Sequence, residues 1–337
     1  MGSVIQLKKE INNSYLELKN LVGNKLEDVS SLIKLKLASE INLIQKMTDH
    51  HLNSGGKRIR PLLTLATSKL CGYKDGSRDI NLAACVELVH GATLLHDDVI
   101  DKSDLRRGIK TSNSIWGNQS SILVGDYLFS RCFELMVEDG SLEVLKLLSS
   151  TSSKIAQGEV LQLEHKGEID MLEETYFNII NMKTAALFST ATRVGACITN
   201  KSKKEKDALE SYGKNIGLAF QIADDALDYY STQKIFGKEI GKDFFEGKAT
   251  LPLIVIFQKA NNEERIFLKE LFKKEKRNED DFSEVLALIN KYKAVQESFK
   301  KAEYFVNIAQ GALGVFEDSI EKKVLQRLTQ FTLNRSF

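Results

Sequence analysis

The sequence predicts an all-α protein, folded over residues 1–337 as a single large helical bundle around a central cavity. Apolar residues recur at helical spacing along almost the whole chain, as in helices that bury one face. Only two prolines occur, Pro61 and Pro252. No long alternation of apolar and polar residues indicates a β-sheet. These three observations favour helices throughout.

Glycine and polar segments separate the expected helices in chain order. The first break is Asn53-Ser54-Gly55-Gly56, the second covers residues 72–77, the third is Gly140, and a glycine-rich break covers residues 237–247. A charged connector at residues 273–281 is interpreted as solvated surface. We expect helices at residues 5–50, 57–71, 79–101, 114–139, 142–165, 171–198, 204–231, 248–260, 263–275, 282–309 and 313–333.

Composition excludes several classes of protein. The chain has 47 basic and 46 acidic residues, so its net charge of +1 favours neither nucleic acid nor an acidic membrane surface. No signal peptide opens the sequence, and no stretch approaches the roughly 20 apolar residues of a membrane span. We expect a soluble, cytoplasmic protein. The cysteines stand singly and are interpreted as buried small hydrophobes of a reducing compartment; they are Cys71, Cys85, Cys132 and Cys197.

Two acidic clusters with the pattern Asp-Asp-x-x-Asp lie 127 positions apart, each in an apolar, helix-like run. Carboxylates are costly there unless something neutralises them. The outer aspartates of each cluster are four positions apart and share a helix face. One cluster alone could equally be a polar face, but two opposed faces could hold Mg²⁺, which prefers oxygen ligands and bridges to phosphates. The clusters are Asp97, Asp98 and Asp101, and Asp224, Asp225 and Asp228.

Basic residues near the clusters complete the predicted site. Lys57 and Arg60 lie three positions apart at the start of a predicted helix, where exposed backbone amides also favour an anion. Arg106 and Arg107 follow the first acidic cluster closely. Each basic residue alone is more often a solvated surface group. Together they predict a pocket for diphosphates, one bound through Mg²⁺ and another by Lys and Arg directly. Further donors are Lys183, Thr184, Lys238, Lys242 and Lys248.

Six motifs in register carry a resemblance to a known family. They are Gly-Gly-Lys-Arg-x-Arg-Pro at residues 55–61, the first acidic cluster with Arg-Arg-Gly, Gly125-Asp126-Tyr127-Leu128, Lys183-Thr184, Phe220-Gln221 before the second cluster, and Gly247-Lys248-x-Thr250-Leu251-Pro252. From about residue 50 to residue 255, the chain resembles the trans-isoprenyl diphosphate synthases. This resemblance implies the isoprenoid synthase fold and Mg²⁺-dependent prenyl transfer.

The resemblance implies a role for each site residue. Asp97, Asp101 and Asp224 would ligate about two or three Mg²⁺ ions that hold the allylic diphosphate. The catalytic residues would be Asp97, Asp98, Asp101, Asp224, Asp225 and Lys183, with Asp228 completing the second cluster. The allylic diphosphate would contact Arg106, Lys183, Thr184, Gln221 and Lys238. Isopentenyl diphosphate would contact Lys57, Arg60, His90 and Arg107.

The resemblance also bears on product length. Short-chain relatives carry an aromatic residue five positions before the first aspartate, where this chain has Ala92. Neither Val89, Leu88 nor Cys85 upstream is aromatic. Since a helical turn rises about 5.4 Å, roughly one extended isoprene unit, an open tunnel here implies a long-chain synthase of the octaprenyl or decaprenyl type, making about eight to ten units. Phe129, Phe133 and Met136 recur at helical spacing on the next predicted helix and could form a deeper floor or simply belong to the core.

Three functions stay open. The leading one is an all-trans polyprenyl diphosphate synthase, a homodimer that extends farnesyl diphosphate for a quinone side chain. A terpene cyclase is disfavoured because cyclisation has no use for a second diphosphate pocket. An inactive regulatory subunit of a heteromeric synthase is disfavoured because both acidic clusters are intact. We expect no nucleic-acid partner and no transmembrane segment. Product release could involve a transient membrane contact.

Overall fold

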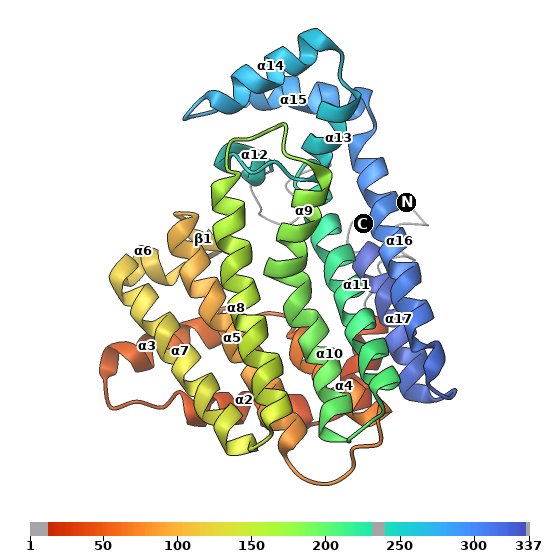
Figure 1. The fold of residues 1–337 in the computed structure, drawn as a ribbon. Coiled ribbons are helices and arrows are strands. Elements are labelled where there is room, and N and C mark those ends of the chain that lie inside the picture. Colours follow the sequence, from red (N-terminus) through yellow and green to blue (C-terminus); the bar gives the residue numbers. More distant parts are fainter. Residues whose placement is uncertain (1–12, 231–239, 335–337) are drawn as a thin grey trace.

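The computed structural model describes residues 13–230 and 240–334, and most of this part of the chain is helical (Figure 1). A first described helix covers residues 13–22. The further elements are α2 (Lys25–Lys36), α3 (Asn42–Asn53), α4 (Ile59–Leu70), α5 (Arg78–Ile100), β1 (Leu105–Arg106), β2 (Ile109–Lys110), α6 (Ser112–Trp116), α7 (Asn118–Asp139), α8 (Leu142–Glu164), α9 (Glu173–Ile180), η1 (Asn181–Ala185), α10 (Ala186–Ile198), α11 (Lys203–Leu227), α12 (Lys242–Glu246), α13 (Leu251–Lys259), α14 (Asn262–Lys273), α15 (Glu279–Lys291), α16 (Ala294–Ala312), η2 (Leu313–Val315) and α17 (Ile320–Asn334). The predicted all-α fold is confirmed.

Several predicted helices are divided in the structure. The prediction of one helix over residues 5–50 is wrong, because Gly23 (φ +58°) ends the first described helix and a non-helical stretch precedes α3. Gly117 (φ +83°) separates α6 from α7. Lys293 (φ +52°) separates α15 from α16. A residue with a left-handed backbone conformation ends a helix and changes the direction of the chain. The spacing of apolar residues does not reveal this conformation.

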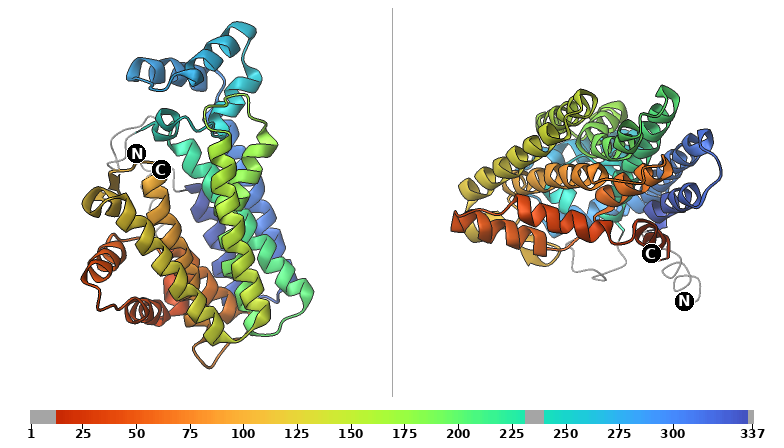
Figure 2. Two further views of the ribbon diagram at one scale, coloured as in Figure 1. Left: turned by 60° about the vertical axis from the view of Figure 1, so that its left-hand side comes forward. Right: turned by 90° about the horizontal axis from the view of Figure 1, so that it is seen from below.

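The long helices α5, α7, α8, α10 and α11 lie side by side and form the body of the bundle (Figures 1 and 2). Two hydrophobic clusters fill it, and α11 contributes to both, through Tyr212 to the first and Ile222 to the second. The helices α14 and α15 project beyond one end of the bundle (Figure 2). The helix α11 therefore connects the two hydrophobic clusters.

Close helix packing places α11 against α10. A Cβ atom added to Gly213 would overlap the backbone of Phe188, and one added to Gly217 would lie 2.6 Å from the Cα of Ala185. Both glycines thus permit a close approach that any larger residue would prevent. This contact fixes the second acidic cluster, at the end of α11, relative to Lys183, which directly precedes α10.

Two further sequence expectations concern the chain as a whole. The cysteines at positions 71, 85, 132 and 197 are buried and form no disulfide, as predicted. Across the described helices, none has both the length and the apolar composition needed to cross a bilayer.

Candidate active site

The two acidic clusters occupy equivalent places in the fold, each at the carboxyl end of a long helix. Asp97 and Asp98 lie in the last turn of α5, and Asp101 caps it. Asp224 and Asp225 lie in the last turn of α11, which Asp228 caps. Both helix ends point toward the end of the bundle where α12 lies (Figure 1).

The carboxylates of the first cluster have different partners. Asp98 is buried, and its Oδ1 accepts hydrogen bonds from Nε (3.0 Å) and Nη2 (2.7 Å) of Arg106. Asp101 accepts a hydrogen bond of 2.9 Å from the Lys248 ammonium. Burial raises the pKa of Asp97 to about 7, and the nearby Asp101 adds to this effect. Arg106, predicted to contact substrate, is thus bound to the carboxylate of Asp98.

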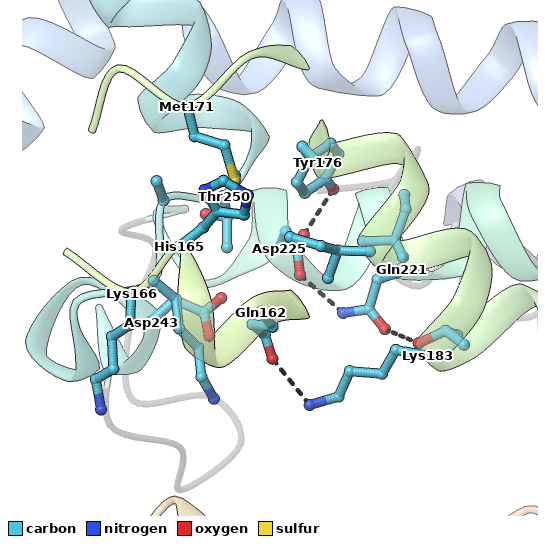
Figure 3. A pocket seen from close by; sticks show the side chains of 15 residues that line it. Gln162, His165, Lys166, Met171, Tyr176, Lys183, Gln221, Asp225, Asp243 and Thr250 are labelled. Carbon is cyan, nitrogen blue, oxygen red and sulfur yellow. Dashed lines mark hydrogen bonds between the residues drawn. The ribbon is translucent and has the colours of Figure 1, made fainter. Parts of the chain in front are cut away.

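The second cluster belongs to a chain of hydrogen bonds (Figure 3). Thr184 donates to Oε1 of Gln221 (2.7 Å), and the amide of Gln221 donates to Asp225 (2.8 Å). The hydroxyl of Tyr176 donates to the other carboxylate oxygen of Asp225 (2.6 Å). Burial raises the pKa of Asp225 to about 7. Asp228 accepts a hydrogen bond of 2.9 Å from the Asp243 backbone N–H.

Lys183 and Thr184 lie on a π-helical turn, η1, where the sequence predicted uninterrupted helix over residues 171–198. Such turns occur as single wide turns within α-helices and often mark functional sites. The turn packs against α8 and α11. Its Lys183 ammonium donates to Glu159 (2.7 Å) and Gln162 (3.0 Å), both on α8.

The segment after α11 connects the two halves of the site. Gly241 (φ +80°) and Gly247 (φ +77°) flank the short helix α12. Lys242 donates to the hydroxyl of Ser103 (2.8 Å), close to the first cluster in sequence. Together with the bond between Lys248 and Asp101, this contact holds residues 241–248 across the end of α5. Lys238, predicted to contact substrate, lies outside the described residues.

The basic residues predicted for isopentenyl diphosphate surround the turn before α4. The predicted helix start at residue 57 is wrong, because α4 begins at Ile59; Lys57 therefore precedes the helix and does not share a helix face with Arg60. The Arg60 guanidinium lies 4.4 Å from the ring centre of Phe188. Arg107 donates from its Nη1 to the carbonyl of Gly55.

His90 lies beside this basic group, on α5. Burial holds the pKa of His90 well below its usual range, and the positive charge of Arg60 acts in the same direction. A neutral imidazole is therefore what this position offers a ligand at neutral pH.

A cavity of about 90 Å³ lies between η1, α9 and the segment that precedes α13 (Figure 3). It brings together residues that the sequence predicted, namely Lys183, Thr184, Gln221, Asp225 and Lys248. It also contains residues that sequence reasoning missed, namely Gln162, Tyr176 and Asp243. Polar positions on an otherwise apolar helix face could have indicated Gln162 and its neighbour Glu159, whereas no local signal marks Tyr176.

A sequence model of the polyprenyl synthetase family matches residues 41–289. The chain belongs to the polyprenyl synthetase family. It is 34% identical over 302 residues to octaprenyl diphosphate synthase of Haemophilus influenzae, covering 90% of this chain and 91% of the relative. As a member of this family it is a prenyltransferase, which the resemblance implied.

Solved structures agree with this assignment to the polyprenyl synthetases. A decaprenyl diphosphate synthase from Rhodobacter capsulatus is similar with a TM-score of 0.91 and 39% identity, over 96% of this chain and 99% of that one. A polyprenyl synthase from Caulobacter crescentus, complexed with calcium and isoprenyl diphosphate, gives a TM-score of 0.91 and 39% identity over 96% and 98% of the two chains. The isoprenoid synthase fold is confirmed.

The two residues predicted to set product length in this polyprenyl synthetase differ in how far their side chains are buried. Ala92 is fully buried on α5, one turn before the first acidic cluster. Phe133 is 47% exposed on α7. The prediction of Phe133 as a tunnel floor is therefore wrong, because its side chain faces away from the interior.

The site offers a divalent cation suitable donors, although they are dispersed. Within residues 13–230 and 240–334, no three Asp, Glu, His or Cys side chains converge closely enough to make a ready metal site. The donors present at the two helix ends are carboxylate oxygens, as a hard cation prefers. Burial raises the pKa of Asp97 and of Asp225, and neighbouring acids act in the same direction. The residue chemistry therefore fits Mg²⁺.

Proposed function

We propose that this polyprenyl synthetase condenses isopentenyl diphosphate repeatedly onto an allylic diphosphate, with farnesyl diphosphate as the primer. The observation that carries the proposal is the bond between Lys248 and Asp101, which brings a cation from beyond the second acidic cluster onto the first. Both clusters and their lysines then surround one end of the bundle, as binding of a diphosphate between them requires.

In this proposal, Asp97, Asp101 and Asp224 would hold about two or three Mg²⁺ ions, whose charge would stabilise the leaving diphosphate. Lys183 on η1 reaches the same group as a further donor, and Thr184 orients Gln221 through their hydrogen bond of 2.7 Å. Arg106 holds Asp98 in place behind the metal ligands. Fixed charges of this kind act most strongly where water is excluded.

The reaction follows from this charge distribution. The allylic C–O bond breaks, its electron pair leaves with the diphosphate, and an allylic carbocation remains. Lys57, Arg60 and Arg107 hold isopentenyl diphosphate so that the electron pair of its double bond forms a new bond to the carbocation. The resulting cation loses a proton to the departed diphosphate, which regenerates an allylic diphosphate five carbons longer.

We further propose a long all-trans product for a quinone side chain. Ala92 has only a small side chain on α5, one turn before the acidic cluster, and each turn of about 5.4 Å corresponds to roughly one isoprene unit, so about eight to ten units are expected. The octaprenyl and decaprenyl relatives support this length. We place the enzyme in the cytoplasm, where its charged substrates dissolve, with a transient membrane contact for product release.

The proposed homodimer would use the exposed faces of α7 and α8. Leu123, Phe133 and Val137 are 67%, 47% and 69% exposed, and helical spacing places them on one side of α7. Leu142 and Val160 are exposed along α8. An apolar surface of this length on two neighbouring helices is typical of contacts between subunits.

The proposal is tested by one incubation of the chain with farnesyl diphosphate, excess isopentenyl diphosphate and Mg²⁺. The products are dephosphorylated and sized by mass spectrometry, with EDTA added to a parallel sample. One dominant long polyprenol that EDTA abolishes is expected. A short polyprenol would retain the reaction and reject the open tunnel. Cyclic products would favour a terpene cyclase, and no product from either substrate would favour the inactive subunit.

A further inference from the structure

We propose that Tyr15 and Ser30 are positioning residues for the turn that carries Lys57, and that they thereby set the affinity for isopentenyl diphosphate. This inference rests on the proposed function, since Lys57 is a substrate contact only there. It concerns two helices that precede the segment matched by the family, residues 41–289. These are the first described helix, residues 13–22, and α2.

The turn has a backbone that needs external support. Gly55 (φ +77°) and Gly56 (φ +148°) precede Lys57, and Arg58 follows it with φ +47°. A left-handed conformation is unfavourable for a residue with a long side chain, and it persists only where neighbouring contacts impose it. Lys57 thus lies between Gly56, which adopts its positive φ without strain, and Arg58, which does not. The direction in which the Lys57 side chain points therefore depends on the contacts that hold the turn.

Three contacts hold the turn from different sides. The hydroxyl of Tyr15 donates to the carbonyl of Lys57 at 3.2 Å. The guanidinium of Arg58 donates to the hydroxyl of Ser30 on α2. Arg107 donates to the carbonyl of Gly55. The first contact fixes the peptide unit between Lys57 and Arg58, the second anchors the Arg58 side chain, and both come from the N-terminal helices.

The N-terminal helices are themselves anchored to the bundle. Lys25 on α2 binds the buried carboxylate of Asp79, at the start of α5, at 2.6 Å. Glu17 on the first described helix binds Arg327 on α17 at 2.8 Å. Tyr15 and Ser30 therefore act from fixed positions. Their contacts hold the turn in a defined position relative to the bundle.

The expected kinetic signature is selective. Removing either hydroxyl lets the turn relax, so Lys57 meets isopentenyl diphosphate less often in a binding geometry. Loss of one hydrogen bond weakens binding by about fivefold. Lys183 in the allylic site is held by Glu159 and Gln162 on α8 rather than by the N-terminal helices, so the affinity for the allylic substrate should stay constant.

The experiment compares Tyr15→Phe, Ser30→Ala and the double variant with the unmodified chain in steady-state kinetics. Each single variant should raise KM for isopentenyl diphosphate by about fivefold, while KM for farnesyl diphosphate and the melting temperature stay constant. Ser30→Thr keeps a hydroxyl and should restore the unmodified KM. Tyr304→Phe is the matched control, because the Tyr304 side chain is largely exposed on α16.

Equal increases of both KM values, a fall in kcat alone, or no change would each overturn the inference. Calorimetric binding of isopentenyl diphosphate without an allylic partner separates this inference from the proposed function. If the unmodified chain binds isopentenyl diphosphate but makes no polyprenol, the proposed function fails. The variants then test the turn by Kd alone, and an unchanged Kd rejects the role of Tyr15 and Ser30.

Discussion

At the residue scale, the three carboxylates of the first acidic cluster differ in how far their charge is balanced. Asp98 is buried against Arg106, and Asp101 binds Lys248. Burial raises the pKa of Asp97 to about 7, and the opposing positive charge of Lys183 does not offset this effect. A divalent cation binds most favourably beside buried carboxylates whose charge is not fully balanced by the protein. Asp97 is therefore the aspartate whose loss should affect turnover most directly.

Asp97→Ala should lower kcat on the order of 100-fold or more, because one carboxylate ligand of the Mg²⁺ that neutralises the leaving diphosphate would be lost. The helical circular dichroism spectrum should stay unchanged. Asp104→Ala is the matched control, since Asp104 lies exposed just beyond the same cluster. Near-normal activity of the Asp97 variant would reject its role as a metal ligand.

Gly56→Ala should raise KM for isopentenyl diphosphate by about tenfold, because the φ of +148° is strained for any side chain. In addition, the new Cβ would lie 2.7 Å from Nη1 of Arg107 and displace this guanidinium. Steady-state kinetics at saturating farnesyl diphosphate measures the effect. Gly314→Ala serves as the control, since its Cβ would enter open space; an unchanged KM for the Gly56 variant would contradict this account.

At the element scale, the helices that the sequence predicted best are long and evenly periodic. The predicted 79–101 and 142–165 correspond closely to α5 (Arg78–Ile100) and α8 (Leu142–Glu164). Errors arose where a single left-handed residue, such as Gly23 or Lys293, redirects the chain without altering the apolar spacing. The π-helical turn was also missed, because its contacts with α8 and α11 depend on tertiary packing.

Gly213→Ala should destabilise the protein by about 1–3 kcal/mol, since its Cβ would overlap the backbone of Phe188 where α10 and α11 meet. Chemical denaturation measures this change. The same substitution at Gly311 on α16 meets no neighbouring atom and should stabilise by about 0.5–1 kcal/mol. Equal effects at both positions would show that the close approach of α10 and α11 is unimportant.

Ala92→Tyr should shorten the product, because it adds an aromatic ring to a fully buried position on α5. Phe133→Ala should leave product length unchanged, because Phe133 faces outward from α7. Mass spectrometry of the dephosphorylated products compares the two variants. An unchanged length for Ala92→Tyr would show that Ala92 does not border the growing chain.

At the scale of the whole molecule, the local sequence pattern predicted a site built on two acidic clusters. It did not predict the hydrogen-bond partners that only the folded structure brings to these clusters. Spacing alone identified both acidic clusters, because four positions on a helix always share a face. Tyr176 is 49 positions from Asp225 in sequence, yet donates a hydrogen bond to it. Such a partner appears only when α9 is packed against α11.

The proposed dimer face is testable at this scale. Leu123→Asp combined with Val137→Asp places two charges on the exposed apolar side of α7 and should convert a dimer to monomers in sedimentation velocity. Ile266→Asp, which is also exposed but lies on α14, should leave the mass unchanged. A dimer that survives the double substitution would place the subunit contact elsewhere.

The wide turn at Asn181–Ala185 restricts how this chain can vary in length. Deleting one residue there would let the helix close into a regular α-helix, so helix stability would not oppose the loss. Because the wide turn accommodates one additional residue, the two halves of the helix would keep nearly the same relative rotation, and only the residues within the turn would shift to a different face. Lys183 and Thr184 would then turn away from Glu159 and Gln221. Selection for catalysis, rather than for folding, should therefore preserve the residue count of this helix in homologous sequences.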